Sequence, residues 1–272
     1  MAAVAAEFAA LAEPGRTPLI VSLPHAGTGI PPELRSRLTP AAQTLADTDW
    51  HVERLYAFAR AAGAAWLEAR VSRYVIDLNR PPDDAALYPG QLSTGLCPVA
   101  SFAGAALYRG AAPLPTEVAE RRARYWDPYH ATLQALIADA KARHGFALLL
   151  DAHSIRSVVP RLFAGRLPDI NLGTHDGRAC DPAIATRLMA RLARQATFSH
   201  VLNGRFKGGY ITRAYGQPQT MVHALQIELA QSAYMDEEAM SYATARAAPL
   251  QALLYELVAE LLAWRPAAGA GG

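Results

Sequence analysis

The sequence is poor in cysteine. Its 272 residues include only Cys97 and Cys180, and no Cys-x-x-Cys motif or Cys/His cluster surrounds either one. This excludes a disulfide framework and a metal site built on thiolates. We therefore expect two reduced thiols in a protein of the cytoplasm, where disulfides are rare.

Long apolar runs and a basic leader are also missing. No apolar stretch reaches the roughly 18 residues that a transmembrane helix needs, although 51% of the residues are hydrophobic. Residues 1–8 carry no positive charge and include Glu7, so we expect no secretory signal. A cytoplasmic protein without a membrane partner is the expectation.

An excess of charge of one sign is absent as well. The 26 basic and 24 acidic residues leave a formal net charge of +2, which is too balanced to indicate nucleic-acid binding through phosphate neutralisation. All the basic residues except Lys141 and Lys207 are arginine. Because a planar guanidinium can grip a carboxylate at two points, single arginines in polar motifs are candidates for carboxylate binding.

The pattern of apolar residues predicts one α/β domain over residues 1–266, followed by a disordered tail over 267–272. Strands are expected at 18–23, 73–78, 145–150 and 220–229, and helices at 49–62, 116–143, 182–196 and 237–264. Strands that alternate with helices predict a three-layer sandwich with a mostly parallel or mixed central sheet.

Polar clusters follow three of the predicted strands. His25 comes after the first, Asn79 and Arg80 after the second, and Asp151 and His153 after the third. Ligands bind at the carboxyl edge of open α/β sheets. The sequence therefore predicts one site at which these three strand ends meet.

The two histidines and a carboxylate could form a metal site. Neutral imidazole is the commonest metal ligand, and a catalytic zinc site often has two histidines, one carboxylate and an open position. His25, His153 and either Asp47 or Asp49 would complete such a set, with Asp151 orienting a histidine from behind. The alternative is that the aspartates only cap a turn or a helix.

Four polar residues could bind a carboxylate. Asn79 and Arg80 precede two prolines that force an extended exit, and Arg156 and Arg213 lie in other polar segments. An arginine beside an amide can hold a carboxylate in two places. A surface turn is the alternative interpretation of the Asn-Arg pair.

Glu228 is one carboxylate within an apolar strand. A buried glutamate without a partner is rare, so Glu228 either forms an ion pair or takes part in the reaction. Beside an activated water it could act as a general base. A serine nucleophile is disfavoured, because no Gly-x-Ser-x-Gly motif is present and Ser154 has no assignable base.

Six motifs together resemble the N-formylglutamate amidohydrolase family, over about residues 18–237. They are Ser22-Leu-Pro-His-Ala-Gly27, Asp47-Thr-Asp-Trp-His-Val-Glu-Arg-Leu-Tyr56, Ser72-Arg-Tyr-Val-Ile-Asp-Leu-Asn-Arg-Pro81, Asp151-Ala-His-Ser-Ile-Arg-Ser157, Asn203-Gly-Arg-Phe-Lys-Gly-Gly209 and Gln226-Ile-Glu-Leu-Ala-Gln231. Each motif alone is weak, but the combination is specific.

The resemblance implies a zinc hydrolase with one Zn²⁺ per chain and a fold related to the zinc carboxypeptidases. It implies that the substrate, N-formyl-L-glutamate, becomes formate and L-glutamate, in the last step of one histidine-degradation route. By the same resemblance Asn79 and Arg80 hold a substrate carboxylate and Glu228 is the general base. The His-x-x-Glu motif of the zinc carboxypeptidases is not kept, because Thr28 stands where that motif has the glutamate. The resemblance therefore carries over Asp49 as the acidic ligand, with Asp47 in reserve.

Two other functions stay open at this point. One is a zinc amidase or carboxypeptidase-like hydrolase of another N-acyl amino acid, which relative rates on formyl-, acetyl- and succinyl-glutamate would reveal. The other is a carboxylate-binding module without turnover. In each case the expected partner is a small carboxylate, and self-association is left open.

Overall fold

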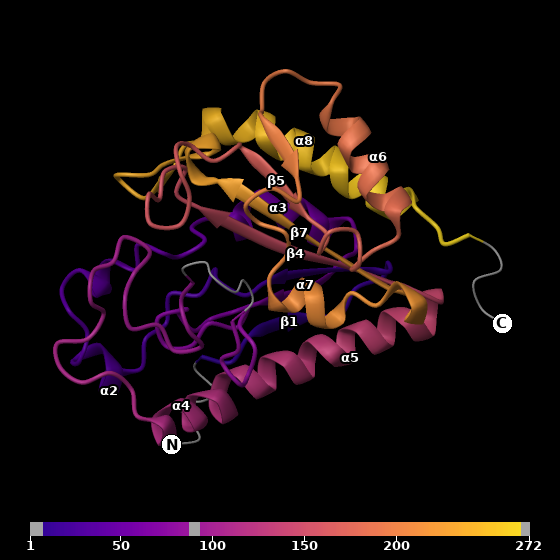
Figure 1. The fold of residues 1–272 in the computed structure, drawn as a ribbon. Helices are drawn as coiled ribbons and strands as arrows, with labels where there is room; N and C mark the ends of the chain where they lie inside the picture. Colours follow the sequence, from indigo (N-terminus) through magenta and orange to yellow (C-terminus); the bar gives the residue numbers. More distant parts are fainter. Residues whose placement is uncertain (1–7, 87–92, 268–272) are drawn as a thin grey trace.

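The computed structural model describes residues 8–86 and 93–267, with a seven-stranded sheet at its centre (Figure 1). The strands of this sheet are β1 (Leu11–Glu13), β2 (Leu19–Leu23), β3 (Ala65–Glu68), β4 (Ala147–Ile155), β5 (Ile170–Gly173), β6 (His200–Leu202) and β7 (Val222–Ala230). From edge to edge they lie in the order β1-β3-β2-β4-β7-β5-β6. Two short strands, β8 (Met235–Asp236) and β9 (Ser241–Tyr242), pair separately.

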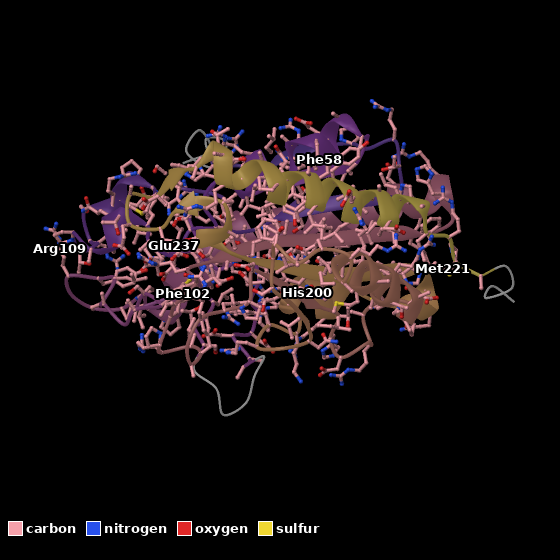
Figure 2. The ribbon with its side chains drawn as sticks, turned by 90° about the horizontal axis from the view of Figure 1, so that it is seen from above. Phe58, Phe102, Arg109, His200, Met221 and Glu237 are labelled. Carbon is pink, nitrogen blue, oxygen red and sulfur yellow. The ribbon has the colours of Figure 1, made fainter. Side chains whose placement is uncertain are left out.

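The sheet is mixed, as expected. Its centre, β3-β2-β4-β7, is parallel, whereas β1 and β5 run antiparallel to their neighbours β3 and β7. The parallel strands therefore share one carboxyl edge. In Figure 2, Phe102 and Glu237 lie toward one end of the molecule, and Met221, directly before β7, lies toward the opposite end.

Helices cover both faces of the sheet (Figure 1). On one face lie α3 (Val52–Ala61), α6 (Pro182–Leu192) and α8 (Thr244–Ala263), and on the other lies α5 (Asp127–His144). Shorter helical segments are α2 (Pro32–Arg35), η1 (Ala42–Thr44), α4 (Pro115–Arg121), η2 (Arg122–Trp126), α7 (Tyr210–Tyr215), η3 (Pro218–Thr220) and η4 (Gln231–Ala233). Within the described ranges, no helix combines the length and apolar character that a bilayer crossing requires.

The central strands are buried on both sides, which gives two hydrophobic cores. Val21 and Leu150 point into the core under α3, α6 and α8, and their neighbours Ile20 and Leu149 point into the core under α5. Because successive side chains of a strand point to opposite faces, a strand covered by helices on both sides becomes a continuous apolar run. This is why the sequence shows these strands plainly.

The prediction of a strand at 73–78 is wrong. The segment forms turns, and its side chains satisfy its backbone: Ser72 Oγ accepts from the Tyr74 N–H at 3.2 Å, and Asp77 Oδ1 accepts from the Asn79 N–H at 2.9 Å. Such local bonds compete with a sheet ladder. The strand beside β2 is instead β3, which the sequence pattern did not reveal.

Two predicted element ends also differ from the structure. β4 continues past 150 to Ile155, because it pairs with β7 along its whole length, so Asp151 and His153 lie on the strand and not after it. The last helix begins at Thr244 and not at 237, because β8 and β9 occupy the preceding residues, and it contains Pro249 without breaking.

The long helix predicted at 116–143 is interrupted. Its first part, α4, passes through the π-helical turn η2 before α5 begins. Pro128 has no N–H for the carbonyl of Arg124, and its ring crowds that carbonyl. A wider turn just before the proline is the local response, and such single π-turns occur frequently at functional sites.

Candidate active site

One cavity lies at the carboxyl edge of the parallel strands. It is lined by side chains from the ends of β2, β4 and β7 and from the loops around them. Its polar and charged lining residues are His25, Asp49, Arg73, Asp77, Asn79, Arg80, Ser93, Thr94, His153, Ser154, Arg205, Gln226 and Glu228. These residues come from seven separate segments of the sequence, which the fold brings to one cavity.

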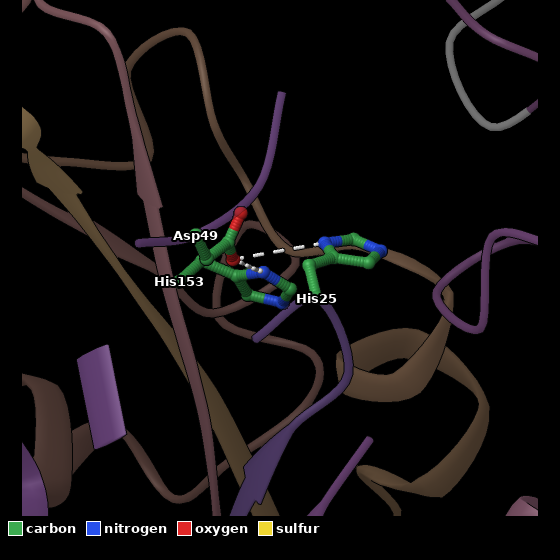
Figure 3. A group of neighbouring side chains, drawn as sticks. All are labelled: His25, Asp49 and His153. Atoms are coloured by element: carbon green, nitrogen blue, oxygen red, sulfur yellow. Dashed lines mark hydrogen bonds and ion pairs between the residues drawn. The ribbon is translucent and has the colours of Figure 1, made fainter. Parts of the chain in front are cut away.

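Two histidines and one aspartate meet in the wall of the cavity (Figure 3). His25 follows β2, Asp49 precedes α3, and His153 lies on β4. Asp49 Oδ2 is 2.9 Å from His153 Nδ1 and 3.7 Å from His25 Nδ1. One candidate ligand atom from each residue lies within 4.8 Å of the others, and all three residues are buried. The three residues named from the sequence are therefore together.

A second carboxylate stands behind each histidine. His25 Nε2 lies 2.7 Å from Asp77 Oδ1, and His153 Nε2 lies 3.0 Å from Asp151 Oδ2. A histidine that donates one ring N–H to a carboxylate offers the lone pair of its other nitrogen to a metal. Both Nδ1 atoms are thus directed at Asp49. Asp151 has the position expected of it, but Asp77 is a residue that the sequence reasoning missed.

The donor set fits a divalent cation such as zinc. His25 Nδ1 is buried and makes no hydrogen bond in the described structure. Burial raises the pKa of Asp49, but the hydrogen bond with His153 and the nearby ring of His25 outweigh it and hold this pKa well below its usual range. Burial lowers the pKa of His153, but Asp151 and Asp49 hold it well above its ordinary value. A proton on His153 therefore supplies positive charge that a metal ion at these ligands would replace.

Asp47, the reserve ligand, lies outside this cluster. Its Oδ2 accepts a hydrogen bond of 2.8 Å from the Phe102 N–H, and burial raises its pKa. The carboxylate therefore holds the loop that carries Phe102, which lines the cavity. Of the two aspartates that the sequence left open, the structure brings Asp49 to the histidines.

Asn79 and Arg80 both line the cavity, but they make different contacts. The Asn79 amide nitrogen is 3.0 Å from Asp151 Oδ2 and 2.8 Å from His153 Nε2, and its oxygen accepts from the Ile211 N–H at 2.7 Å. Arg80 Nε lies 3.7 Å from Asp77 Oδ2. The amide of Asn79 thus donates to Asp151, the carboxylate behind His153, while Arg80 contributes a cation to the cavity wall.

Arg156 and Arg213 are not among the lining residues of this cavity. Arg156 pairs with the exposed carboxylate of Glu238, and Arg213 Nε donates to the Gly208 carbonyl at 2.8 Å. The structure therefore does not place these two arginines beside Arg80 in the lining of this cavity.

Two other arginines take part in the cavity wall. Arg73 Nη2 is 2.7 Å from Asp77 Oδ2, and Arg205 Nε donates to the Leu162 carbonyl at 2.8 Å. Both residues belong to motifs given above, but their sequence context did not indicate a role. The position of Arg205 between a glycine and an aromatic residue in the Asn203–Gly209 motif was the available signal.

Glu228 lies beside His153 in the register of β4 and β7. Its side chain is buried, Gln226 Nε2 donates to its Oε2 at 2.9 Å, and burial raises its pKa to about 8. A carboxyl group with a pKa near neutrality can both accept and return a proton. It therefore has the environment that general acid–base chemistry requires.

Fold and site together define a class of protein. A mixed α/β sheet carries at its carboxyl edge a candidate metal centre of two histidines and one carboxylate, beside a further buried carboxylate. Two histidines and one carboxylate beside a further buried carboxylate are an arrangement that metal-dependent hydrolases use.

Comparison with known proteins gives the family. The family model for N-formylglutamate amidohydrolase matches residues 17–235. N-formylglutamate deformylases of Pseudomonas aeruginosa and Pseudomonas putida are 54% and 50% identical over 252 residues, which are 92% of this chain and 94% of each relative. The chain therefore belongs to the N-formylglutamate amidohydrolase family.

Solved structures agree on the fold. The N-formylglutamate amidohydrolase of Ralstonia eutropha JMP134 superposes with a TM-score of 0.80 at 28% identity, over 94% of this chain and 98% of that one. A protein of Agrobacterium tumefaciens superposes with a TM-score of 0.69 at 20% identity, over 93% and 96%. The α/β fold expected from the sequence is confirmed.

Proposed function

We propose that this protein hydrolyses N-formyl-L-glutamate to formate and L-glutamate, with one zinc ion held by His25, Asp49 and His153. Two relatives that share half or more of the aligned residues are named N-formylglutamate deformylases. The observation that carries the proposal is the buried group of two histidines and an aspartate, with Glu228 on the adjacent strand. The reaction corresponds to the last step of one histidine-degradation route.

The reaction adds water across the formyl C–N bond, which places the hydroxyl on the carbon and a proton on the leaving nitrogen. A bound zinc ion would polarise the formyl carbonyl and acidify water at the site. Glu228 takes a proton from the attacking water and returns it to the leaving amine. Gln226 fixes the carboxylate for this task, because its amide donates to Oε2 and leaves Oε1 for the water.

The two carboxylates of the substrate require two cations. The cavity offers Arg73, Arg80 and Arg205, and the guanidinium of Arg73 is buried against Asp77. We therefore assign the substrate carboxylates to Arg80 and Arg205, which reach the cavity from separate segments. Arginine suits this role because its planar fork matches a carboxylate.

Asn79 supports the metal centre in this proposal and does not itself reach the substrate. Its amide group is bonded to Asp151 and to the backbone of Ile211. Arg156 and Arg213 have no part in the proposed reaction. The two free cysteines of the structure, Cys97 and Cys180, are consistent with a cytoplasmic location.

Formate release from N-formyl-L-glutamate tests the proposal. Purified protein should release formate, lose this activity after treatment with a chelator, and regain it when zinc is added. N-acetyl- and N-succinyl-L-glutamate should be poor substrates if the formyl group is the specific acyl group. A metal-loaded protein that releases no formate, or one that hydrolyses the larger acyl groups better, would contradict the assignment.

A further inference from the structure

One side chain from η2 and one from α5 hold the backbone on both sides of Asn79. His130 Nε2 lies 2.9 Å from the Leu78 carbonyl oxygen, and Trp126 Nε1 donates to the Arg80 carbonyl at 3.0 Å. The turn carries the two residues that brace the metal centre and line the cavity. Its backbone is therefore anchored by side chains that themselves lie outside the cavity lining.

The hydrogen bonds of His130 fix its tautomer. Nδ1 lies 2.8 Å from the hydroxyl of Tyr215, and Nε2 faces a carbonyl oxygen, which can only accept. The ring therefore carries its proton on Nε2 and accepts from Tyr215 at Nδ1. Burial lowers the pKa of His130 to about 4, so the ring is neutral near pH 7.

The π-helical turn η2 and the start of α5 place the two donors, Trp126 and His130, next to each other. Trp126 ends the π-helical turn η2, and His130 follows four residues later on the same face. The two rings stack with centroids 3.7 Å apart, and the ring of Tyr215 lies nearly parallel to that of His130, with centroids 5.8 Å apart. A helix without the wider turn would present the indole at a different angle, so the turn preceding Pro128 sets the position of both donors.

The third carbonyl of the turn is held from another element. The Tyr210 N–H at the start of α7 donates to the Asn79 carbonyl at 3.4 Å. The space beside Asn79 also requires glycine at position 209, since a Cβ there would lie 2.4 Å from the Asn79 side chain. The turn at Leu78–Arg80 is therefore held from two directions, by side chains of η2 and α5 and by the start of α7.

We propose that Trp126 and His130 are positioning residues, which hold the Leu78–Arg80 backbone so that the Arg80 guanidinium faces the substrate carboxylate. This inference rests on the proposed function of Arg80. The competing interpretation is that the aromatic cluster contributes only to the hydrophobic core under α5. The two interpretations differ in whether removal of a single N–H donor affects catalysis through Arg80.

The first experiment compares two buried tryptophans. Trp126→Phe removes the donor to Arg80, whereas Trp264→Phe makes the same change in the opposite core, where Trp264 packs on Phe146 and His223. Both variants should lower Tm. Only Trp126→Phe should lower kcat/KM for N-formyl-L-glutamate, by about three- to tenfold, the range expected for loss of one neutral hydrogen bond.

A double-mutant cycle tests whether the effect passes through Arg80. In an Arg80→Ala background, Trp126→Phe should change kcat/KM by less than about twofold, because the group that it positions is gone. An equal decrease in both backgrounds, or no decrease in the wild-type background, would overturn the positioning role. If Arg80→Ala itself kept a normal kcat/KM, the carboxylate assignment would be wrong and the positioning role would be wrong with it.

His130 offers a conservative rescue. The amide of His130→Gln can still donate to the Leu78 carbonyl, whereas His130→Phe keeps the ring volume and loses the donor. We expect the glutamine variant to retain most of kcat/KM and the phenylalanine variant to lose about three- to tenfold. Equal kcat/KM values in folded preparations of both variants would contradict the role of His130.

Discussion

Replacing Glu228 by glutamine separates catalysis from structure at this position. Glutamine is nearly isosteric, and its side-chain oxygen can still accept the hydrogen bond that Gln226 gives to Oε2 at 2.9 Å. The replacement therefore preserves packing and the local hydrogen bond, and removes only the ability to take a proton. Since zinc needs three protein ligands, the metal site of His25, Asp49 and His153 should stay filled.

The expected loss follows from this separation. General acid–base catalysis contributes about 10²–10⁴-fold, which corresponds to roughly 2.7–5.5 kcal/mol of activation free energy at about 1.36 kcal/mol per tenfold. Loss of a hydrogen bond alone would cost only about 0.5–1.5 kcal/mol, and Glu228→Gln keeps that bond. We therefore expect kcat to fall at least about 100-fold, with an unchanged zinc content.

A matched control is available at Glu237, which is the same residue type in a structural role. Its carboxylate accepts from the Ser157 N–H at 2.6 Å, the Ser157 hydroxyl at 2.8 Å and the Ser232 N–H at 3.0 Å. Glu237→Gln should therefore lower Tm and leave kcat close to that of the wild type. Glu228→Gln should instead lower kcat and leave Tm close to that of the wild type.

The assay measures zinc content, Tm and formate release on one preparation of each protein. A folded, zinc-loaded Glu228→Gln enzyme with near-normal kcat would refute the assignment of Glu228 as the general base. A large decrease of Tm with unchanged turnover per folded molecule would show instead that the carboxylate only supports the strand.

Four further outcomes are expected. His153→Ala should lose bound zinc, and a full equivalent in elemental analysis would show that the ligand set is wrong. Asp77→Asn should weaken zinc binding by about 10–100-fold, as for other carboxylates behind a histidine ligand; a chelator competition that gives the wild-type Kd would contradict this. Arg80→Lys keeps the charge and loses the fork, so it should impair kcat/KM, and Arg80→Ala should cost about 2–5 kcal/mol by analogy with truncated charge pairs; wild-type kinetics would exclude the role. Arg205→Ala should lower kcat/KM for N-formyl-L-glutamate much more than for N-formylglycine, which lacks the second carboxylate, and equal losses would reject the assignment.

The local sequence determined the elements that are buried on both faces. β2, the first half of β4 and most of β7 are apolar because helices cover both sides of the sheet, so their pattern is visible without any tertiary information. His25 and His153 were recognisable because each follows or ends such a run, and parallel strands place their carboxyl ends at one edge. Glu228 was recognisable as a single carboxylate inside a strand.

The tertiary structure decided which neighbours of these residues join the site. Asp47 and Asp49 are equivalent in sequence, and only the fold turns Asp49 toward the histidines and Asp47 toward the backbone of Phe102. Asp77 sits behind His25 because its segment forms turns and not a strand. Four of the six residues at 73–78 are apolar, and this local pattern fits either structure.

The arginines show the same division. The three candidates, Arg80, Arg156 and Arg213, and also Arg205, to which no role was assigned, all lie in polar motifs of the sequence, and the sequence did not show which of them would share one site. Of these four arginines, Arg80 and Arg205 line the cavity. The direction of a long side chain on a loop depends on contacts with distant segments, such as the Arg205 bond to the Leu162 carbonyl, and these contacts exist only once the chain has folded.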